Sequence, residues 1–434
     1  MTSSTDILLC IGYFVVWILT FIWYHIKRPQ LDAGSVIIGM QVVYAFFSIL
    51  TISDALFSYA FNELKLFPYI YLYSMLMVAL LPVIRFHVHP AQSIRGGSSR
   101  ILVLTSLVLF LTAVLQIPDM MSEASTGLAK LITESDAGKE AYEETADSMS
   151  QAGSKIRNVP AVLFNMLSDL IPFLLFYFMS LKKKKSRIII LCLFVAMLIN
   201  ILLPVTRGQR NGTVQGILTV VAAFFMFRAY ISRKARRIIQ TIGFTVILLF
   251  SVPVIAITMS RFGEKAAGAA GYVNWYVGQG SLYFNNYGLD AGGTRNGDRT
   301  AYMIKRLIDP STPKNYVERR DKYPNLYIDD YFFVTFVGDF TIDFGPYLAT
   351  LIIIAFGLII MSRIRIRDGS IALYDFMLLY FAICVSIQGG MTLFSYSDTG
   401  NLRIVAFLML YAYLRYHERL LGKFGKADTP HEQT

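Results

Sequence analysis

The chain has 434 residues, of which 55% are hydrophobic and only 16% are charged. Soluble domains carry about a quarter of charged residues, so this composition excludes an ordinary soluble protein and favours a polytopic membrane protein. The formal net charge is +11, but Lys and Arg gather in the cytoplasmic loops of membrane proteins. The charge therefore does not indicate nucleic acid as a partner.

Mostly apolar segments of about 18 residues recur along the chain, and each is long enough to cross a bilayer as a helix. They predict an all-α, polytopic integral membrane protein with about eleven transmembrane helices, in which residues 1–434 form a single transmembrane domain. No small-x-small cleavage site follows the first segment, so we interpret it as a span. The predicted spans are 7–24, 35–52, 68–84, 101–117, 162–181, 188–204, 214–227, 241–259, 347–361, 371–387 and 404–416.

Clusters of Lys and Arg predict which connections are cytoplasmic. The strongest cluster lies at 182–187. Its position, and the clusters after other spans, place the N-terminus outside and the C-terminus in the cytoplasm. Two long connections, 119–160 and 260–345, are then external, and the larger one separates helices 8 and 9. The connection 388–403 is expected outside too, unless it is re-entrant.

Three arginines are predicted at outer helix ends, against the usual distribution of basic residues. Arg207 and Arg210 lie in the turn between spans six and seven, and Arg261 lies where span eight ends. An arginine there requires a lipid headgroup, an internal carboxylate or an anionic substrate. Guanidinium groups bind phosphate bidentately and stay charged in a low-dielectric site. We predict that these three residues are catalytic and hold a diphosphate; headgroup anchoring and internal ion pairs are the alternatives.

The 260–345 connection combines basic and aromatic residues. Arg295, Arg299 and Arg306 are candidate substrate-binding residues, together with Trp275 and Tyr283. Sugar faces stack on aromatic rings, and a tyrosine also offers a hydroxyl group. The alternatives are that the charges are solvated, and that the aromatic residues form a small core of the loop or lie in the interfacial belt.

Acidic residues precede span nine at the outer boundary. A carboxylate at this place could accept the proton of an attacking sugar hydroxyl as a general base. Asp339 and Asp343 are therefore candidate catalytic residues. They could equally pair with the arginines of the loop.

Several kinds of site are not indicated. All five histidines map to the predicted cytoplasmic side, so external chemistry cannot use a histidine base or a histidine-bound metal. The sequence has no Walker-type phosphate loop and no GxGxxG after a strand, and its three cysteines form no CxxC motif. We predict no metal and no cofactor. The histidines are His25, His87, His89, His417 and His431.

The architecture resembles the Wzy-type polymerases of bacterial oligosaccharide repeat units, which make O-antigen and capsule. The likeness is the number of spans, the two longer external loops and two short motifs. One is Thr206-Arg207-Gly208, which is similar to a Ser/Thr-Arg-Gly turn of that family. The other runs from Gly338-Asp339 to Asp343-Phe344-Gly345, before a span.

The resemblance implies a metal-independent glycosyltransferase of the bacterial inner membrane. It implies transfer of a growing glycan from undecaprenyl diphosphate onto a lipid-linked repeat unit at the outer face, in contact with membrane lipids and with a chain-length regulator and a flippase as potential partners. External arginines would hold the diphosphate: Arg207 by the motif, and Arg210, Arg261 and Arg295 by loop location.

Two alternatives stay open. An O-antigen ligase uses the same donor, but that family is expected to carry a histidine in its large external loop, where this chain has none. A lipid-linked oligosaccharide flippase should have short loops throughout and charges within its spans.

Overall fold

A computed structural model describes residues 3–88, 91–96, 99–123, 159–181, 186–207, 210–262 and 268–424. Most of the predicted external connection 119–160 and the basic residues 182–185 therefore lie outside the described residues. The side chains of Arg210 and Arg261 lie outside them as well, although the backbone of each belongs to a described helix.

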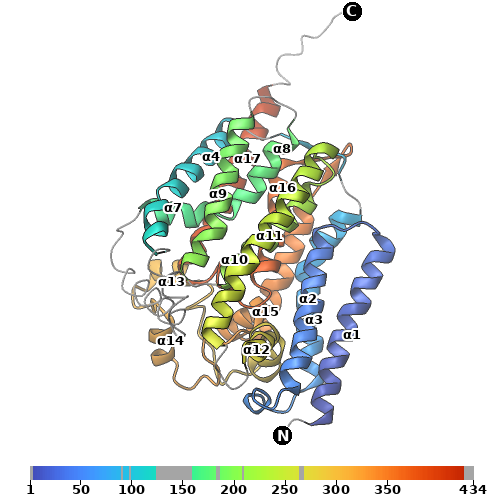
Figure 1. Ribbon diagram of the computed structural model, residues 1–434, viewed down its shortest axis with the longest axis vertical. Helices are drawn as coiled ribbons and strands as arrows, with labels where there is room; N and C mark the ends of the chain where they lie inside the picture. The colour runs from blue at the N-terminus through green and yellow to red at the C-terminus, as the bar shows by residue number, and fades with distance from the viewer. Residues whose placement is uncertain are drawn as a thin grey trace, which may run out of the picture.

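The chain is mostly helical, and its long helices run roughly along one axis of the molecule (Figure 1). Seven helices are long and apolar enough to cross a membrane, and a bent pair makes up to eight. The N-terminus lies at the end that also carries α12, α13 and α14, whereas α17 ends at the opposite end. The N-terminal half contains α1 (Ser4–Lys27), α2 (Ala33–Ser53), η1 (Ser58–Ala60), α3 (Leu66–Val88), β1 (Ser93–Arg95), α4 (Ser99–Val114), α7 (Val159–Leu167), α8 (Leu170–Ser180), α9 (Ser186–Thr206) and α10 (Arg210–Phe227).

The C-terminal half alternates long helices with shorter ones. Its elements are α11 (Arg233–Phe262), α12 (Gly268–Tyr283), the π-helical turn η2 (Phe284–Gly288), α13 (Tyr302–Ile308), α14 (Tyr316–Lys322), α15 (Thr335–Arg363), β2 (Ile366–Arg367), β3 (Ser370–Ala372), α16 (Leu373–Gln388), η3 (Asp398–Gly400) and α17 (Asn401–Phe424). Each of the eleven predicted spans overlaps a described helix. The α10 and α16 helices are shorter than a typical span, and α17 is not among the described helices apolar enough to cross a membrane, so the count of eleven stays a prediction.

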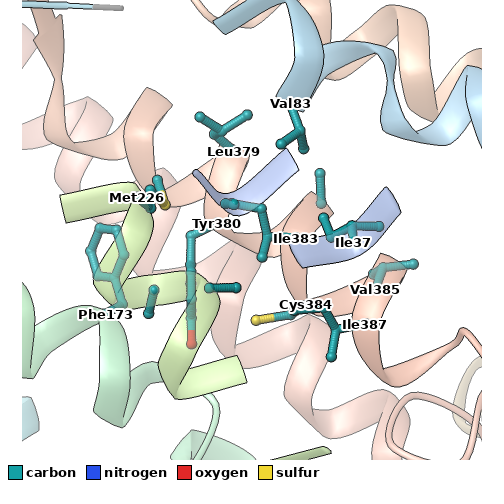
Figure 2. Close-up of a cluster of buried hydrophobic side chains, with 14 of the residues drawn as sticks. Ile37, Val83, Phe173, Met226, Leu379, Tyr380, Ile383, Cys384, Val385 and Ile387 are labelled. Atoms are coloured by element: carbon teal, nitrogen blue, oxygen red, sulfur yellow. The ribbon is translucent and has the colours of Figure 1, made fainter. Parts of the chain in front are cut away.

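The α16 helix is the centre of the bundle. Between Phe376 and Val385 it is apolar on every face, and it is almost wholly buried, as expected for a helix that is surrounded by other helices. Figure 2 shows Tyr380 and Ile383 of α16 among Ile37 from α2, Val83 from α3 and Phe173 from α8. By contrast, α11 exposes most of its apolar residues, as a helix at the rim of a membrane bundle does.

Two of the predicted spans are interrupted in the structure. The fifth, predicted as one helix over 162–181, is broken at Ser168 and Asp169, and its halves α7 and α8 meet at a bend of 61°. The ninth begins earlier, because residues 335–344 are helical and mostly buried. Gly345, with φ +76° and ψ 160°, then interrupts α15 before Pro346; this backbone region is essentially restricted to glycine.

A small sheet was not predicted. The strands follow the order β1-β3-β2, with β1 parallel and β2 antiparallel to β3. Ser93 pairs with Ser370 and Ile366 with Ile371. Because each strand is only two or three residues long, the usual alternation of apolar and polar residues is too short to recognise.

The predicted loop 260–345 is largely folded. We call residues 268–334 the cap, because they cover one end of the bundle with α12, η2, α13 and α14. The α12 helix packs against α2, where the Thr51 hydroxyl donates a hydrogen bond of 2.8 Å to the carbonyl oxygen of Asn274. The cap is therefore docked on the bundle by helix packing.

Gly278 determines how closely α12 approaches α2. A Cβ atom at this position would lie 2.4 Å from the backbone carbonyl of Phe47. We expect Gly278→Ala to destabilise the fold by about 1–3 kcal/mol, since the backbones must separate. Thermal unfolding of the purified chain in detergent measures the effect.

Gly280 provides the matched control in the same helix. A Cβ atom there would lie 3.6 Å from the methyl group of Thr335, an ordinary contact. Alanine is also a better helix former than glycine by roughly 1 kcal/mol, so Gly280→Ala should be neutral or stabilising. Equal melting temperatures for the two variants would contradict the proposed close packing.

Candidate functional site

The candidate site contains the two carboxylates that we predicted to be catalytic. Asp339 and Asp343 lie four residues apart in the first part of α15, and thus on one face of the helix. Both side chains are fully buried. A buried carboxylate requires a cation or hydrogen-bond donors, and here other segments of the chain supply both.

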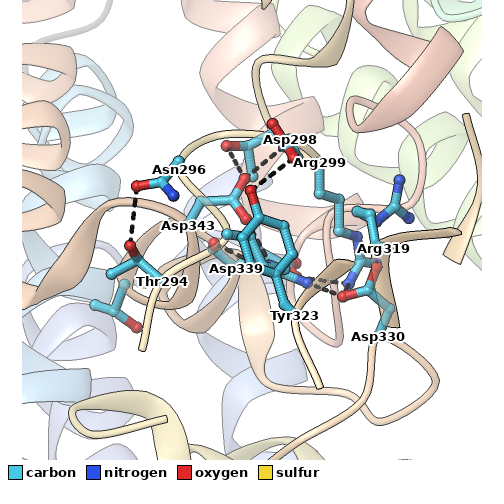
Figure 3. Close-up of polar contacts among 12 residues, drawn as sticks. Thr294, Asn296, Asp298, Arg299, Arg319, Tyr323, Asp330, Asp339 and Asp343 are labelled. Atoms are coloured by element: carbon cyan, nitrogen blue, oxygen red, sulfur yellow. Dashed lines mark hydrogen bonds and ion pairs between the residues drawn. The ribbon is translucent and has the colours of Figure 1, made fainter. Parts of the chain in front are cut away.

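Two arginines contact these carboxylates, and a third joins the group through Asp330. Arg295 Nε lies 2.6 Å from Asp343 Oδ1, and one of its terminal nitrogens also pairs with Asp330. Arg299 lies 3.1 Å from Asp339 and 3.7 Å from Asp330. Figure 3 shows Arg299, Asp330, Asp339 and Asp343 gathered in one place. Arg319 in α14 completes the group, because it pairs with Asp330 and Asp398.

We call these seven residues the charged cluster. The three guanidinium groups are at most 4% exposed. Burial lowers the pKa of the Arg295 guanidinium, although the nearby Asp343 carboxylate acts in the opposite direction. Arginine nevertheless stays protonated in proteins, so the cluster is ionic. Its members are Arg295, Arg299, Arg319, Asp330, Asp339, Asp343 and Asp398.

Hydrogen bonds from backbone amides and from threonine hydroxyls fix the geometry of the cluster. Asp343 Oδ2 accepts hydrogen bonds from the amide and the hydroxyl of Thr300, at 2.6 and 2.5 Å. Asp339 Oδ2 accepts from the Thr392 hydroxyl at 2.8 Å and from the Leu393 amide at 2.6 Å. The two aspartates thus connect α15 both to the cap and to the connection before α17.

A second group of charges lies beside the cluster. The buried Asp298 carboxylate accepts hydrogen bonds from Lys305, from Lys322 at 2.8 Å and from the Tyr323 hydroxyl at 2.7 Å. Burial acts to raise the pKa of Asp298, but these three hydrogen bonds outweigh it and hold the pKa below its ordinary value. Asp298 is therefore ionised at neutral pH.

The two groups together are electrically balanced. Among the described residues, five basic side chains face five carboxylates. Arg295 and Arg299, which we predicted to bind substrate, are thus each engaged by internal aspartates in this structure. A phosphate could bind to either only by displacing a carboxylate. The balanced residues are Arg295, Arg299, Lys305, Arg319 and Lys322 with Asp298, Asp330, Asp339, Asp343 and Asp398.

The remaining predicted substrate residues lie at the cap surface and in its interior. Arg306 is partly exposed, stacks at 5.7 Å over the ring of Tyr302 and donates a hydrogen bond to its hydroxyl. Trp275 stacks on Phe57 with ring centres 5.9 Å apart. Tyr283 is buried, and its ring centre lies 4.5 Å from that of Phe332.

Trp275 and Tyr283 belong to a second apolar core, separate from that of the bundle. The buried residues of this core include Tyr283, Ile328 and Ile342, and Trp275 packs against them. The sequence left open whether these aromatic residues bind sugar, form a small core of the loop or lie in the interfacial belt. In the structure, Trp275 and Tyr283 lie in a small core of the loop.

Arg207 lies at the end of α9 and has a carboxylate partner. Its Nε donates to Glu123 at 3.2 Å, and the Thr206 hydroxyl donates to the same carboxylate. An internal ion pair was one alternative for this residue. The α10 helix packs against both α9 and α11, so the backbones of Arg207, Arg210 and Arg261 lie at one end of the bundle.

The sequence interpretation missed a polar group inside the bundle. Asp169, at the break between α7 and α8, accepts hydrogen bonds of 3.0 Å from Gln388 Nε2 and from Arg403. The Tyr380 hydroxyl donates to the Asp169 carbonyl oxygen at 2.8 Å. A signal was available, since an aspartate inside an apolar run is costly in a membrane and requires a partner. Arg319 and Asp398 were also missed, and no local pattern connects them.

Within the described part of the chain, no group of three or more His, Cys, Asp or Glu side chains could hold a metal ion. The carboxylates of the charged cluster are each bound by cations. Comparison with known proteins finds no matching family model and no significantly similar curated protein or solved structure. The function of this chain must therefore be inferred from its own residues.

Proposed function

We propose that the chain is a polysaccharide polymerase of the bacterial inner membrane, which transfers a glycan from undecaprenyl diphosphate onto a lipid-linked repeat unit. The observation that carries this proposal is the position of the predicted phosphate-binding arginines. Arg207, Arg210 and the end of α11 at Arg261 lie at adjacent helix ends of an apolar bundle. A ligand that combines a long lipid with a diphosphate suits such a place.

Glu123 has a defined part in this proposal. Carboxylate and phosphate oxygens both accept hydrogen bonds from guanidinium groups in the same geometry. The Glu123 carboxylate, which contacts Arg207 Nε at 3.2 and 3.3 Å, occupies the place that a phosphate oxygen would take. Binding of the donor would then exchange one anion for another, without leaving Arg207 unpaired.

The proposed reaction needs only the lipid-linked substrates. A hydroxyl of the acceptor sugar attacks the anomeric carbon of the donor, and the bond from that carbon to the diphosphate oxygen breaks. Negative charge grows on the leaving diphosphate, where preorganised arginines stabilise it most. The hydroxyl proton passes to a carboxylate; Asp339 and Asp343 stay the predicted acceptors, although both are enclosed by the charged cluster.

Polymerase assays on two arginines, one at each end of α9, test the proposal. We expect Arg207→Ala to lower the polymerisation rate by about 100- to 1,000-fold, because one contact to the developing charge is removed. The full chain is reconstituted in nanodiscs with lipid-linked repeat units extracted from cells that lack it, and the product ladder is followed on gels.

Arg187→Ala is the matched control, since Arg187 is exposed at the other end of the same helix. It should retain the wild-type ladder. If wild-type chain yields no ladder, or Arg207→Ala polymerises at the wild-type rate, the proposal fails. Transfer to a lipid A core without a ladder would indicate the ligase, and lipid translocation without any new glycosidic bond would indicate the flippase.

A further inference from the structure

A cavity of about 530 Å³ lies at the end of the bundle opposite to the cap. Arg363 follows Asp339 by 24 residues along α15, which corresponds to roughly 36 Å of helix measured along its bent axis. The volume falls in the range of small-molecule sites, roughly 300–1,000 Å³. We call it the arginine cavity; its lining residues are Arg95, Ser362, Arg363, Arg365, Arg367, Tyr374, Asp375 and Arg415.

The fold brings these residues together from five elements. The small sheet places Arg95 of β1 and Arg367 of β2 on either side of β3. Asp375 follows directly in the first turn of α16, and Arg363 is the last residue of α15. Arg415 comes from α17. The unpredicted sheet therefore serves to assemble a basic concavity.

The arginines of this cavity are not neutralised as those of the charged cluster are. Arg365 Nε donates to the Ser362 carbonyl at 3.4 Å, and Arg415 donates to the Tyr411 hydroxyl at 3.1 Å. Arg95 lies 3.9 Å from Glu418. Among the described residues, the other four arginines of the cavity have no carboxylate within 4.0 Å. Five cations thus face one buried carboxylate, Asp375, inside the cavity.

An excess of solvated basic residues at one membrane face is common, and Arg233, Arg236 and Arg237 at the start of α11 are of that kind. The arginine cavity differs, because its guanidinium groups line one concave volume that is open to solvent. A bound anion would relieve the repulsion between them. Planar guanidinium groups match phosphate oxygens in pairs, and basic pockets between membrane helices bind phosphorylated lipid headgroups.

We propose that the arginine cavity binds an anion with two phosphoryl groups. Two neighbouring phosphoryl groups occur in soluble diphosphates and in the headgroup of diphosphatidylglycerol, and the cavity suits this feature in either kind of ligand. With Glu418 beside Arg95 counted together with Asp375, three positive charges remain in excess, more than one phosphate neutralises. This site is independent of the proposed polymerase reaction, which takes place at the other end of the bundle.

Binding measurements on the full chain test this site. In neutral detergent, isothermal titration with inorganic pyrophosphate should show one site per chain. In the triple variant Arg363→Gln, Arg365→Gln, Arg367→Gln the Kd should rise at least tenfold. Native mass spectrometry from nanodiscs of phosphatidylcholine, with or without diphosphatidylglycerol, shows whether the chain retains that lipid. If the lipid is retained and pyrophosphate displaces it, the natural ligand of the cavity is a lipid.

A second triple variant, Arg233→Gln, Arg236→Gln, Arg237→Gln, removes the same charge from the same end of the bundle, outside the cavity. It should bind pyrophosphate as the wild type does. Asp375→Asn should bind more tightly, because the only opposing carboxylate in the lining is removed. Equal losses in the two triple variants, or no saturable binding of either probe to the folded wild-type chain, would overturn the proposal.

Discussion

Asp339→Ala is expected to lower the free energy of unfolding by about 3–5 kcal/mol, because it removes the nearer carboxylate of the buried Arg299 and leaves it Asp330 at 3.7 Å. Asp339 pairs with Arg299 at 3.1 Å and lies 3.9 Å from Arg295. It also accepts hydrogen bonds from Thr392 and Leu393. Folded proteins are stable by only about 5–15 kcal/mol, so this single change removes a large part of the total. Chemical unfolding in detergent micelles, followed by circular dichroism, measures it.

Two further variants distinguish charge from hydrogen bonding. Asp339→Asn keeps an oxygen for Thr392 and Leu393 but removes the charge, so its loss should be intermediate. Asp329→Ala is the matched control, since Asp329 forms a long ion pair of 3.9 Å with the exposed Arg320 at the surface. Surface pairs contribute less than about 1 kcal/mol. Equal stabilities for Asp339→Ala and Asp329→Ala would show that the charged cluster does not hold the cap.

The same variants also bear on catalysis. A general base is lost in Asp339→Asn even where the fold persists. If the Asp339→Asn protein folds and polymerises normally, Asp339 is not the general base, and its role is structural. A folded but inactive protein would support the predicted catalytic role.

Arg403→Ala is expected to lower the free energy of unfolding by about 3 kcal/mol, because the buried carboxylate of Asp169 then loses its positively charged partner. Asp169 is 6% exposed and lies at the bend between α7 and α8. The loss should therefore also loosen the packing of α8 against its neighbours. Unfolding in detergent is again the measurement, and protection of the α8 amides from hydrogen exchange locates the change.

The double variant Asp169→Leu, Arg403→Leu serves as the control for this pair. Replacing both charges by apolar residues of similar size is often neutral or stabilising. The double variant should therefore be more stable than Arg403→Ala alone. If both proteins lose the same stability, the packing of Arg403 and not its charge is what matters.

Much of the fold could be predicted from single segments. Apolar runs such as 7–24 and 35–52 fall on helices because a chain in lipid must satisfy its backbone hydrogen bonds within each segment. The limits of the helices were less predictable. The break at Asp169 depends on Arg403 and Gln388, which are more than 200 residues away in sequence.

The charged residues show where local information stops. Sequence analysis identified Arg295, Arg299, Asp339 and Asp343, but it left open whether they bind substrate or one another. Their present partners are known only because the turn after Arg295, the first part of α15 and the connection before α17 meet in space. Arg319 joins them from α14, and nothing in its neighbouring residues indicated this.

By itself, the sequence determined that this chain is a bundle of apolar helices with polar, charge-rich connections. Hydrophobicity and helical hydrogen bonding act within a segment, so a run of residues suffices to show them. Only the tertiary structure decided which charges neutralise one another in the charged cluster and which stay in excess in the arginine cavity. An ion pair depends on distances of a few ångströms between residues far apart in sequence, and folding alone sets those distances.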